Sequence, residues 1–173
     1  MRRLDRVLHR DANARPADAM LTLPFELRRR SRLLVRLDSG EEAGLFLERG
    51  TVLHDGDRLG AIDGRIVQVV AAIESIYFVR PCASCTLAQA AYHLGNRHVP
   101  VEIGKDHLKI ERDPVLRNML EQQGALVVEA KAAFQPEPGA YGGGHRHGHD
   151  AGHDEEHGLA QSVFASRHDA RQS

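Results

Sequence analysis

Two helix-start signals in the second half of the chain constrain its fold most strongly. Thr86 and Gln89 have the spacing of a capping box, in which the Thr hydroxyl and the Gln amide satisfy free N–H groups at a helix start. Residues 113–114, Asp-Pro, combine an N-cap with a proline at the first helical position. Apolar residues follow each signal at helical spacing. We expect Gly95 to end the first helix in the left-handed conformation and Gly124 to end the second.

Strand-like runs surround both helices. Residues 76–80 precede the first helix, 99–103 and 108–111 form a pair between the helices, and 126–130 follow the second. The order β-α-β-β-α-β is that of a ferredoxin-like split βαβ unit. We therefore predict a ferredoxin-like domain over residues 75–140.

The residues before this domain have a different pattern. Five short apolar runs, at 20–24, 32–37, 43–47, 51–53 and 65–70, alternate with turn signals rich in Gly and Asp. Such spacing predicts a small all-β domain, a barrel or a sandwich, over residues 1–74. The whole chain is then expected to be α+β.

Charge is unevenly distributed along the chain. The formal net charge is -1, although residues 1–36 contain ten Arg. Five of them, at positions 28, 29, 30, 32 and 36, either form a basic surface for an acidic partner or lie on a solvated strand edge, where charge discourages pairing with another sheet. The balanced total argues against a nucleic-acid partner, because general polyanion binders are basic.

A histidine-rich segment lies near the end of the chain. Neutral imidazole is a common ligand of Ni, Cu and Zn ions, and Asp and Glu between the histidines add oxygen ligands. Irregular spacing without thiolates predicts a flexible binder of several ions, with a purification tag or a merely polar tail as alternatives. We expect residues 141–173 to be a disordered metal-binding tail, because they cannot bury enough apolar surface to order. The candidate ligands are His145, His147, His149, His153 and His157.

Two further histidines lie around the expected end of the first helix. His93 and His98 are five residues apart. A cation bound beyond the last helical carbonyls gains from the negative end of the helix dipole. His98 is therefore a candidate metal ligand and His93 a candidate accessory ligand, and an ordinary surface histidine is the alternative for each.

Cys82 and Cys85 form a C-x-x-C motif at the junction of a strand and a helix. A thioredoxin-like redox motif would occupy such a junction. A zinc site would need a second pair of ligands, which the spacing does not supply. We keep three interpretations, namely two small residues in a loop, an accessory soft-metal site, and a thiol oxidoreductase.

Several classes of protein are not indicated by the sequence. It contains no P-loop, dinucleotide-binding, metalloprotease or hydrolase motif, so we expect no enzyme activity. It has no apolar run long enough to span a membrane, and its basic start lacks the apolar region of a secretory signal. Two closely spaced cysteines are also consistent with a reducing compartment. We expect a soluble cytoplasmic protein with no membrane and no nucleic-acid partner.

Several segments resemble the urease accessory protein E (UreE) family of nickel metallochaperones. The resemblance is carried by Tyr-His-Leu-Gly-Asn-Arg-His-Val-Pro at residues 92–100, by Ile-Glu-Arg-Asp-Pro-Val-Leu at 110–116, and by residues 134–142 with the histidine-rich tail. It is dense from about residue 75 to residue 157 and looser upstream.

The resemblance implies a peptide-binding-like N-terminal domain and a metal-binding domain through which the protein forms a homodimer. It also implies that His98 lies at the dimer interface, where two copies bind one Ni²⁺ ion. The cargo would be delivered to apo-urease with other urease accessory proteins, including the accessory GTPase. Zn²⁺ or Cu²⁺ can also bind such ligands. A histidine-rich metal buffer or storage protein is the alternative function, and a C-x-x-C thiol oxidoreductase is a further one.

Overall fold

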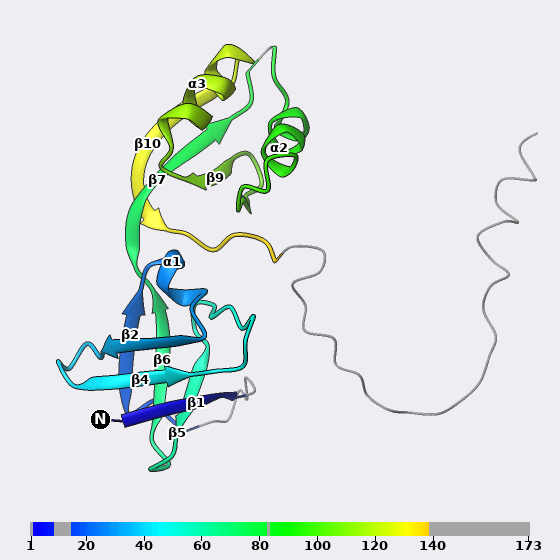
Figure 1. The fold of residues 1–173 in the computed structure, drawn as a ribbon. Coiled ribbons are helices and arrows are strands. Elements are labelled where there is room, and N and C mark those ends of the chain that lie inside the picture. The colour runs from blue at the N-terminus through cyan, green and yellow to red at the C-terminus, as the bar shows by residue number, and fades with distance from the viewer. Residues whose placement is uncertain (1, 9–14, 83, 139–173) are drawn as a thin grey trace, which may run out of the picture.

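The computed structural model describes residues 2–8, 15–82 and 84–138. These residues form two sheets, one in each lobe of the molecule, and β6 and β7 connect the lobes (Figure 1). Among the described helices, none has the length and apolar character needed to cross a membrane.

The first sheet has the strand order β2-β6-β5-β1-β4-β3. One of its faces is packed with aliphatic side chains, including Leu4, Leu21, Leu59 and Val67, which are fully buried. The alternating exposure along β6 shows that only one face contributes to this core. The strands are β1 (Arg2–Leu8), β2 (Ala19–Leu23), β3 (Arg32–Arg36), β4 (Glu42–Phe46), β5 (Arg58–Ala61) and β6 (Ile66–Ala71).

This lobe differs from the prediction in four elements. Strands β1 and β5 were not predicted, and residues 51–53 are not a strand, although Leu53 is fully buried. A one-turn helix, α1 (Phe25–Arg28), begins after Pro24, so the lobe is not purely β. Four residues are too few for a helical period to be detected. The charged residues of β1 leave Leu4 as its one buried side chain, so its sequence shows no alternation.

The second sheet has the order β10-β7-β9-β8, and all its pairs are antiparallel. The element order predicted from the sequence is the order observed. Helices α2 and α3 share a core with the sheet that includes Tyr77, Leu94, Ile110, Leu120 and Val127. The elements are β7 (Ile73–Arg80), α2 (Leu87–Gly95), β8 (Glu102–Ile103), β9 (Leu108–Glu111), α3 (Pro114–Gln122) and β10 (Leu126–Ala133).

A third core cluster joins the two lobes. The rings of Phe25 and Phe134 meet edge to face with centroids 5.3 Å apart, and Ile76 packs with them. Arg28 is fully buried beside this cluster. The segment that follows β10 is therefore held between the lobes, where Figure 1 shows it crossing the molecule.

The guanidinium of Arg28 hydrogen-bonds to both lobes. It donates to the carbonyl oxygens of Leu23 at 3.2 Å and Leu53 at 3.0 Å in the first lobe. It also donates to the carbonyl of Phe134 and to Oε1 of Gln135, the latter at 2.9 Å. Buried charge is stable only when its hydrogen-bonding capacity is used, and these four oxygens meet that requirement.

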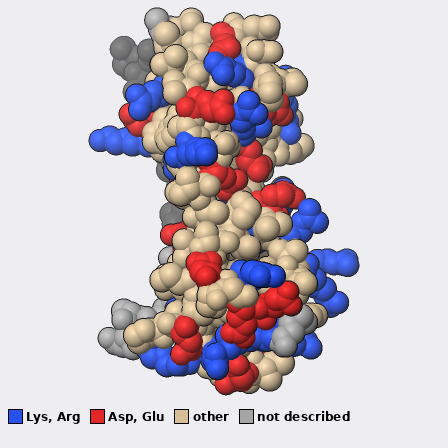
Figure 2. Space-filling model, turned by 90° about the vertical axis from the view of Figure 1, so that its left-hand side faces the viewer, with Lys and Arg blue, Asp and Glu red and all other residues tan. Residues whose placement is uncertain are grey.

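Other arginines of the first lobe form ion pairs. Arg29 and Arg30 pair with Glu26, and Arg36 pairs with Glu42. Strand β3 lies at the edge of the sheet, so the strand-edge interpretation fits Arg32 and Arg36. It is wrong for Arg28, which belongs to α1 and is buried, and Arg29 and Arg30 follow that helix and not a strand. Figure 2 shows Lys and Arg interspersed with Asp and Glu on the face it presents.

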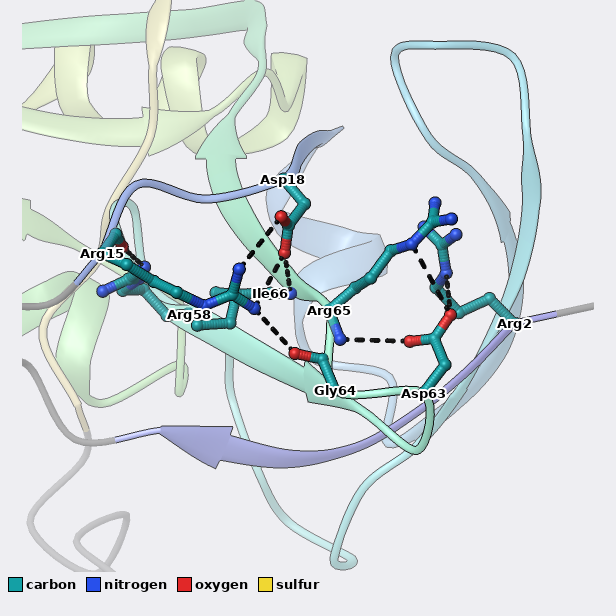
Figure 3. A network of polar contacts seen from close by, with 8 residues as sticks. All are labelled: Arg2, Arg15, Asp18, Arg58, Asp63, Gly64, Arg65 and Ile66. Atoms are coloured by element: carbon teal, nitrogen blue, oxygen red, sulfur yellow. Dashed lines mark hydrogen bonds and ion pairs between the residues drawn. The ribbon is translucent and has the colours of Figure 1, made fainter.

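A network of such contacts surrounds the start of β6 (Figure 3). Asp18 accepts a hydrogen bond from Ile66 N at 2.7 Å, which is the main reason that the pKa of Asp18 is lowered. Asp63 likewise accepts from Arg65 N at 3.1 Å, and its pKa is lowered. Arg2 pairs with Asp63 at 3.3 Å. These contacts fix the hairpin between β5 and β6.

Candidate metal centre

The end of α2 determines where His98 lies. His98 N–H donates to the carbonyl of Gly95 at 2.9 Å, and Val99 N–H donates to that of Leu94 at 3.2 Å. These two bonds are those of a Schellman motif, in which the chain leaves the helix through a left-handed residue. That residue is His98, with φ of 55°. The expectation that Gly95 is the left-handed stop was wrong, because Gly95 is not among the residues with positive φ.

An apolar pair explains why the chain turns away from α2 at His98, three residues after the last helical residue, Gly95. A Schellman motif places the residue after the left-handed position against the residue five positions earlier. Here these residues are Val99 and Leu94, and both pack in the core of the second sheet. A stop at Gly95 would have placed the polar Asn96 in the position of Val99. The spacing of Leu94 and Val99 was thus a signal in the sequence that the left-handed residue lies at position 98.

The exposed His98 lines an open groove of about 410 Å³. The N-terminus of α3 also lines it, and there Oδ1 of Asp113 accepts hydrogen bonds from Val115 N at 2.7 Å and Leu116 N at 3.2 Å. Arg112, also in the groove, pairs with Glu129 at 2.9 Å. The remaining lining residues are Val99, Pro100, Glu111 and Leu116.

Glu111 is the half-buried carboxyl of this groove. Burial raises its pKa above the ordinary value of 4.5, and the carboxylates of Glu74 and Glu26 raise it further. Arg29 opposes this shift. Proton binding to Glu111 is therefore favoured in the folded chain relative to a solvated glutamate.

One copy of the chain offers an incomplete metal site. Within residues 2–8, 15–82 and 84–138, no three side chains of His, Cys, Asp or Glu gather around a common point that could hold an ion. His98 contributes a single imidazole at the groove, and an ion bound there needs ligands from elsewhere.

Among the described residues, the other predicted ligands form no group of three with His98. His93 lies on α2, where its ring contacts Tyr92 edge to face. Cys82 and Cys85 precede α2, whose nine residues correspond to about 13 Å of helix, so helix α2 separates them from His98. Five predicted ligands, His145, His147, His149, His153 and His157, lie outside the described residues.

The root of the histidine-rich tail is fixed close to His98. Gln135 N–H donates to Glu102 at 2.6 Å, and Glu137 N–H donates to the carbonyl of Val101 at 2.9 Å. Val101 is only three residues beyond His98. The pairing of Gln135 with Arg28 was not predicted, because a hydrogen bond between residues 107 positions apart leaves no local pattern.

Comparison with known proteins gives the same family for both lobes. The family model described as UreE urease accessory protein, N-terminal domain, matches residues 2–72, and the corresponding C-terminal domain matches residues 74–163. A urease accessory protein UreE of Paraburkholderia xenovorans (strain LB400) is 55% identical over 148 residues, which cover 86% of this chain and 66% of the relative. A second, from Burkholderia thailandensis, is 56% identical over 148 residues, with coverage of 86% and 70%.

Proposed function

Because the chain belongs to the UreE family of urease accessory proteins, we propose that it is a nickel metallochaperone, which binds Ni²⁺ and delivers it for assembly of the urease metallocentre. Its role in urease maturation follows from the family, and nickel delivery is the proposal. The ion is cargo, so the chain catalyses no reaction. The observation that carries the proposal is the left-handed conformation of the exposed His98.

The left-handed backbone of His98 has a cost in conformational energy. The left-handed conformation costs a residue other than glycine about 1–2 kcal/mol. A glycine at position 98 would end α2 without this cost. Strained backbone of this kind gathers at functional sites, where the surrounding structure holds it in place. The strain at His98 thus supports a role for its imidazole, as the candidate ligand beside the groove.

A second copy of the chain would complete the site. Tyr92 is 66% exposed on α2, and Val115 is 75% exposed at the start of α3, next in sequence to the groove residue Leu116. A homodimer formed through this face would bury them and bring two His98 imidazoles to one two-fold axis. Two imidazoles leave coordination positions of Ni²⁺ open, so that a receiving protein can compete for the ion.

The tail can supply further ligands at this axis. His145 follows the anchored Glu137 by eight residues, an extended reach of about 26–29 Å. Glu137 is bonded to Val101, and three residues of chain from Val101 to His98 span at most about 11 Å. The five candidate ligands of the tail, His145 to His157, can therefore collect ions and present them to His98. The same ligands also bind Zn²⁺ or Cu²⁺.

The proposal divides the chain into three parts. Residues 1–74 form a peptide-binding-like domain, residues 75–140 a ferredoxin-like domain that dimerises, and residues 141–173 the metal-binding tail. The strand order β10-β7-β9-β8 supports the ferredoxin-like assignment. The proposed receivers are apo-urease and the other accessory proteins, including the accessory GTPase, in the cytoplasm.

Urease activation at limiting nickel tests the proposal. Cells that lack their own copy of this protein would express the full chain, the His98→Asn variant, or His54→Asn as a control in the first lobe. Asn tolerates the left-handed conformation, so His98→Asn keeps the helix end while removing the imidazole. We expect His98→Asn to lose most urease activation and His54→Asn to retain it.

Two results would overturn the proposal. One is full activation of urease by His98→Asn. The other is a chain that binds nickel but neither increases urease activation nor co-purifies with apo-urease or the accessory GTPase, which would indicate a metal buffer.

A further inference from the structure

The nickel proposal leaves the paired cysteines of the β7–α2 loop unused. Cys82 N–H donates to the carbonyl of Cys85 at 3.0 Å, and Cys85 N–H donates to that of Cys82 at 3.2 Å. Two residues that exchange both hydrogen bonds form a directly opposed antiparallel pair, and their side chains lie on the same face. Both thiols are free. The backbone therefore directs the two Cβ atoms, and with them the thiols, toward the same side.

We propose that Cys82 and Cys85 form a Cu(I) site, in which the two thiolates ligate the ion. Directly opposed residues have Cβ atoms about 4.5–5.5 Å apart, with hydrogen-bonded pairs at the wider end. A disulfide needs a Cβ separation of about 3.5–4.5 Å. An ion that bridges the sulfurs through two bonds of about 2.3 Å, as for zinc thiolates, fits the wider separation better than a direct S–S bond.

The loop that carries the cysteines is held in place on both sides. Thr86, which follows Cys85, forms the predicted capping box with Gln89 and so fixes the start of α2. Ser84 lies against Gly124 at the end of α3, where a Cβ on residue 124 would overlap its hydroxyl. Cys85 is 2% exposed and packs in the core, whereas Cys82 is exposed. Cys82 can turn toward Cys85 without disturbing the core.

The ligand set favours Cu(I) among the metal ions. Thiolates are soft ligands that select Cu(I), zinc and iron–sulfur clusters. Structural zinc sites use four ligands, and the part of the chain that the structure describes gathers no third candidate ligand with these cysteines. Monovalent copper is satisfied by two thiolates in a nearly linear arrangement.

Binding conserves charge and involves no oxidation. One Cu⁺ displaces two thiol protons, so the products are two H⁺ and a copper dithiolate with a net charge of minus one. The N-terminus of α2, which directly follows the loop, favours negative charge. The sulfur of Cys85 gives up only a weak bond, since it donates to the carbonyl of the adjacent Thr86 at 3.6 Å.

Anaerobic competition for Cu(I) tests the site in the full-length protein. The reduced chain, Cys82→Ser and the control His98→Asn would each be titrated against Cu(I)–bicinchoninate, and X-ray absorption would identify the atoms bound to copper. We expect one Cu(I) per chain at this site, with two sulfur neighbours. Cys82→Ser should weaken that binding by at least about 100-fold, which exceeds the usual effect of replacing a residue that only orients a metal ligand. His98→Asn should leave Cu(I) binding unchanged.

The readouts also separate this inference from the nickel proposal. Because the cysteines and His98 lie at opposite ends of α2, Cys82→Ser should bind nickel normally. Copper bound only through nitrogen or oxygen in the unaltered chain would assign it to imidazoles and overturn the dithiolate site. The same holds if Cys82→Ser binds Cu(I) as tightly as the unaltered chain. Cys82 is exposed, so its replacement tests the ligand without disturbing the fold.

Discussion

The two helices of the second lobe end with the same hydrogen bonds but with different residues. At the end of α3, Gly124 N–H donates to the carbonyl of Glu121 at 2.9 Å and Ala125 N–H to that of Leu120 at 3.0 Å. This is the Schellman pattern of α2, with Gly124 in place of His98. Both residues are left-handed, with φ of 89° for Gly124 and 55° for His98.

The surroundings explain what this difference means. At the end of α3, the neighbouring Ser84 leaves no room for a side chain on residue 124. At the end of α2, His98 is exposed beside an open groove. The end of α3 therefore needs glycine at position 124, both for its conformation and for lack of space. The end of α2 has room for the His98 side chain, which is present despite the conformational cost. The same hydrogen-bond pattern serves packing at α3 and, in our proposal, metal capture at α2.

The largest effect is expected at Gly124. Gly124→Ala forces a side chain into the left-handed region and against the Ser84 hydroxyl, so we expect a loss of about 2–3 kcal/mol in the free energy of unfolding. Denaturant titration followed by circular dichroism measures it. The double variant Gly124→Ala with Ser84→Ala should recover part of the loss. Equal costs for the single and double variants would show that crowding by Ser84 is irrelevant.

A branched side chain at His98 should give a smaller loss. His98→Val places a β-branched residue at positive φ, which we expect to lower the free energy of unfolding by about 1 kcal/mol relative to His98. His98→Asn is the matched control and should be close to neutral, because Asn tolerates this conformation. If Val and Asn were equally stable in the same denaturant titration, the strain at this position would be negligible.

Glycine at position 98 should instead raise the free energy of unfolding. His98→Gly removes the left-handed cost of about 1–2 kcal/mol but adds about 0.4–1 kcal/mol of unfolded-chain entropy. We therefore expect a net gain of about 0.5–1 kcal/mol, which corresponds to roughly 1–4 °C in Tm. Differential scanning calorimetry of the metal-free chain measures it. A lower Tm for His98→Gly would contradict the comparison of the two helix ends.

The smallest effects on stability are expected for two carboxyl groups, one in the groove beside His98 and one near the end of α3. Burial raises the pKa of Glu111, so the folded chain binds more protons than the unfolded one, and this group weakens folding as pH rises above 4.5. Glu111→Gln should therefore raise the free energy of unfolding slightly at neutral pH, because solvent screens the half-buried carboxylate, and the gain should vanish below pH 4.5.

Near the end of α3, the corresponding replacement of a glutamate is expected to lower the free energy of unfolding. Glu121 pairs with Arg117 at 2.8 Å, so Glu121→Gln should lower stability slightly. Thermal unfolding at several pH values compares the two variants. A pH-independent gain for Glu111→Gln would contradict the role assigned to its proton.

The parts of the fold that depend on local chemistry could be predicted from the sequence. The capping box at Thr86 and the Asp113 cap are both present, because the interactions that define them lie within three residues. The stop at Gly124 is confirmed by its positive φ. Helix α2 ends at Gly95 as predicted, but its left-handed residue was misplaced, because glycine preference was considered without the apolar pair of Leu94 and Val99.

The parts that depend on distant contacts could not be predicted. Strand β1 pairs in parallel with β4, about 40 residues away, and its own residues show no clear period. The buried Arg28 was counted with a surface run of arginines, since its partners Phe134 and Gln135 lie in the other lobe. His98 could be named as a candidate ligand from its place at a helix end, but its left-handed backbone needed the structure.

Calorimetric titration with nickel tests the central claim most directly. The chain compared would be the full-length protein with all six histidines of residues 141–173 replaced by Asn, with and without His98→Gly. We predict that the chain with His98 binds one Ni²⁺ per two copies, and that His98→Gly abolishes this binding although it folds more stably. Equal nickel binding by both chains would contradict the account, because His98 would then be a strained helix end with no role in holding the metal.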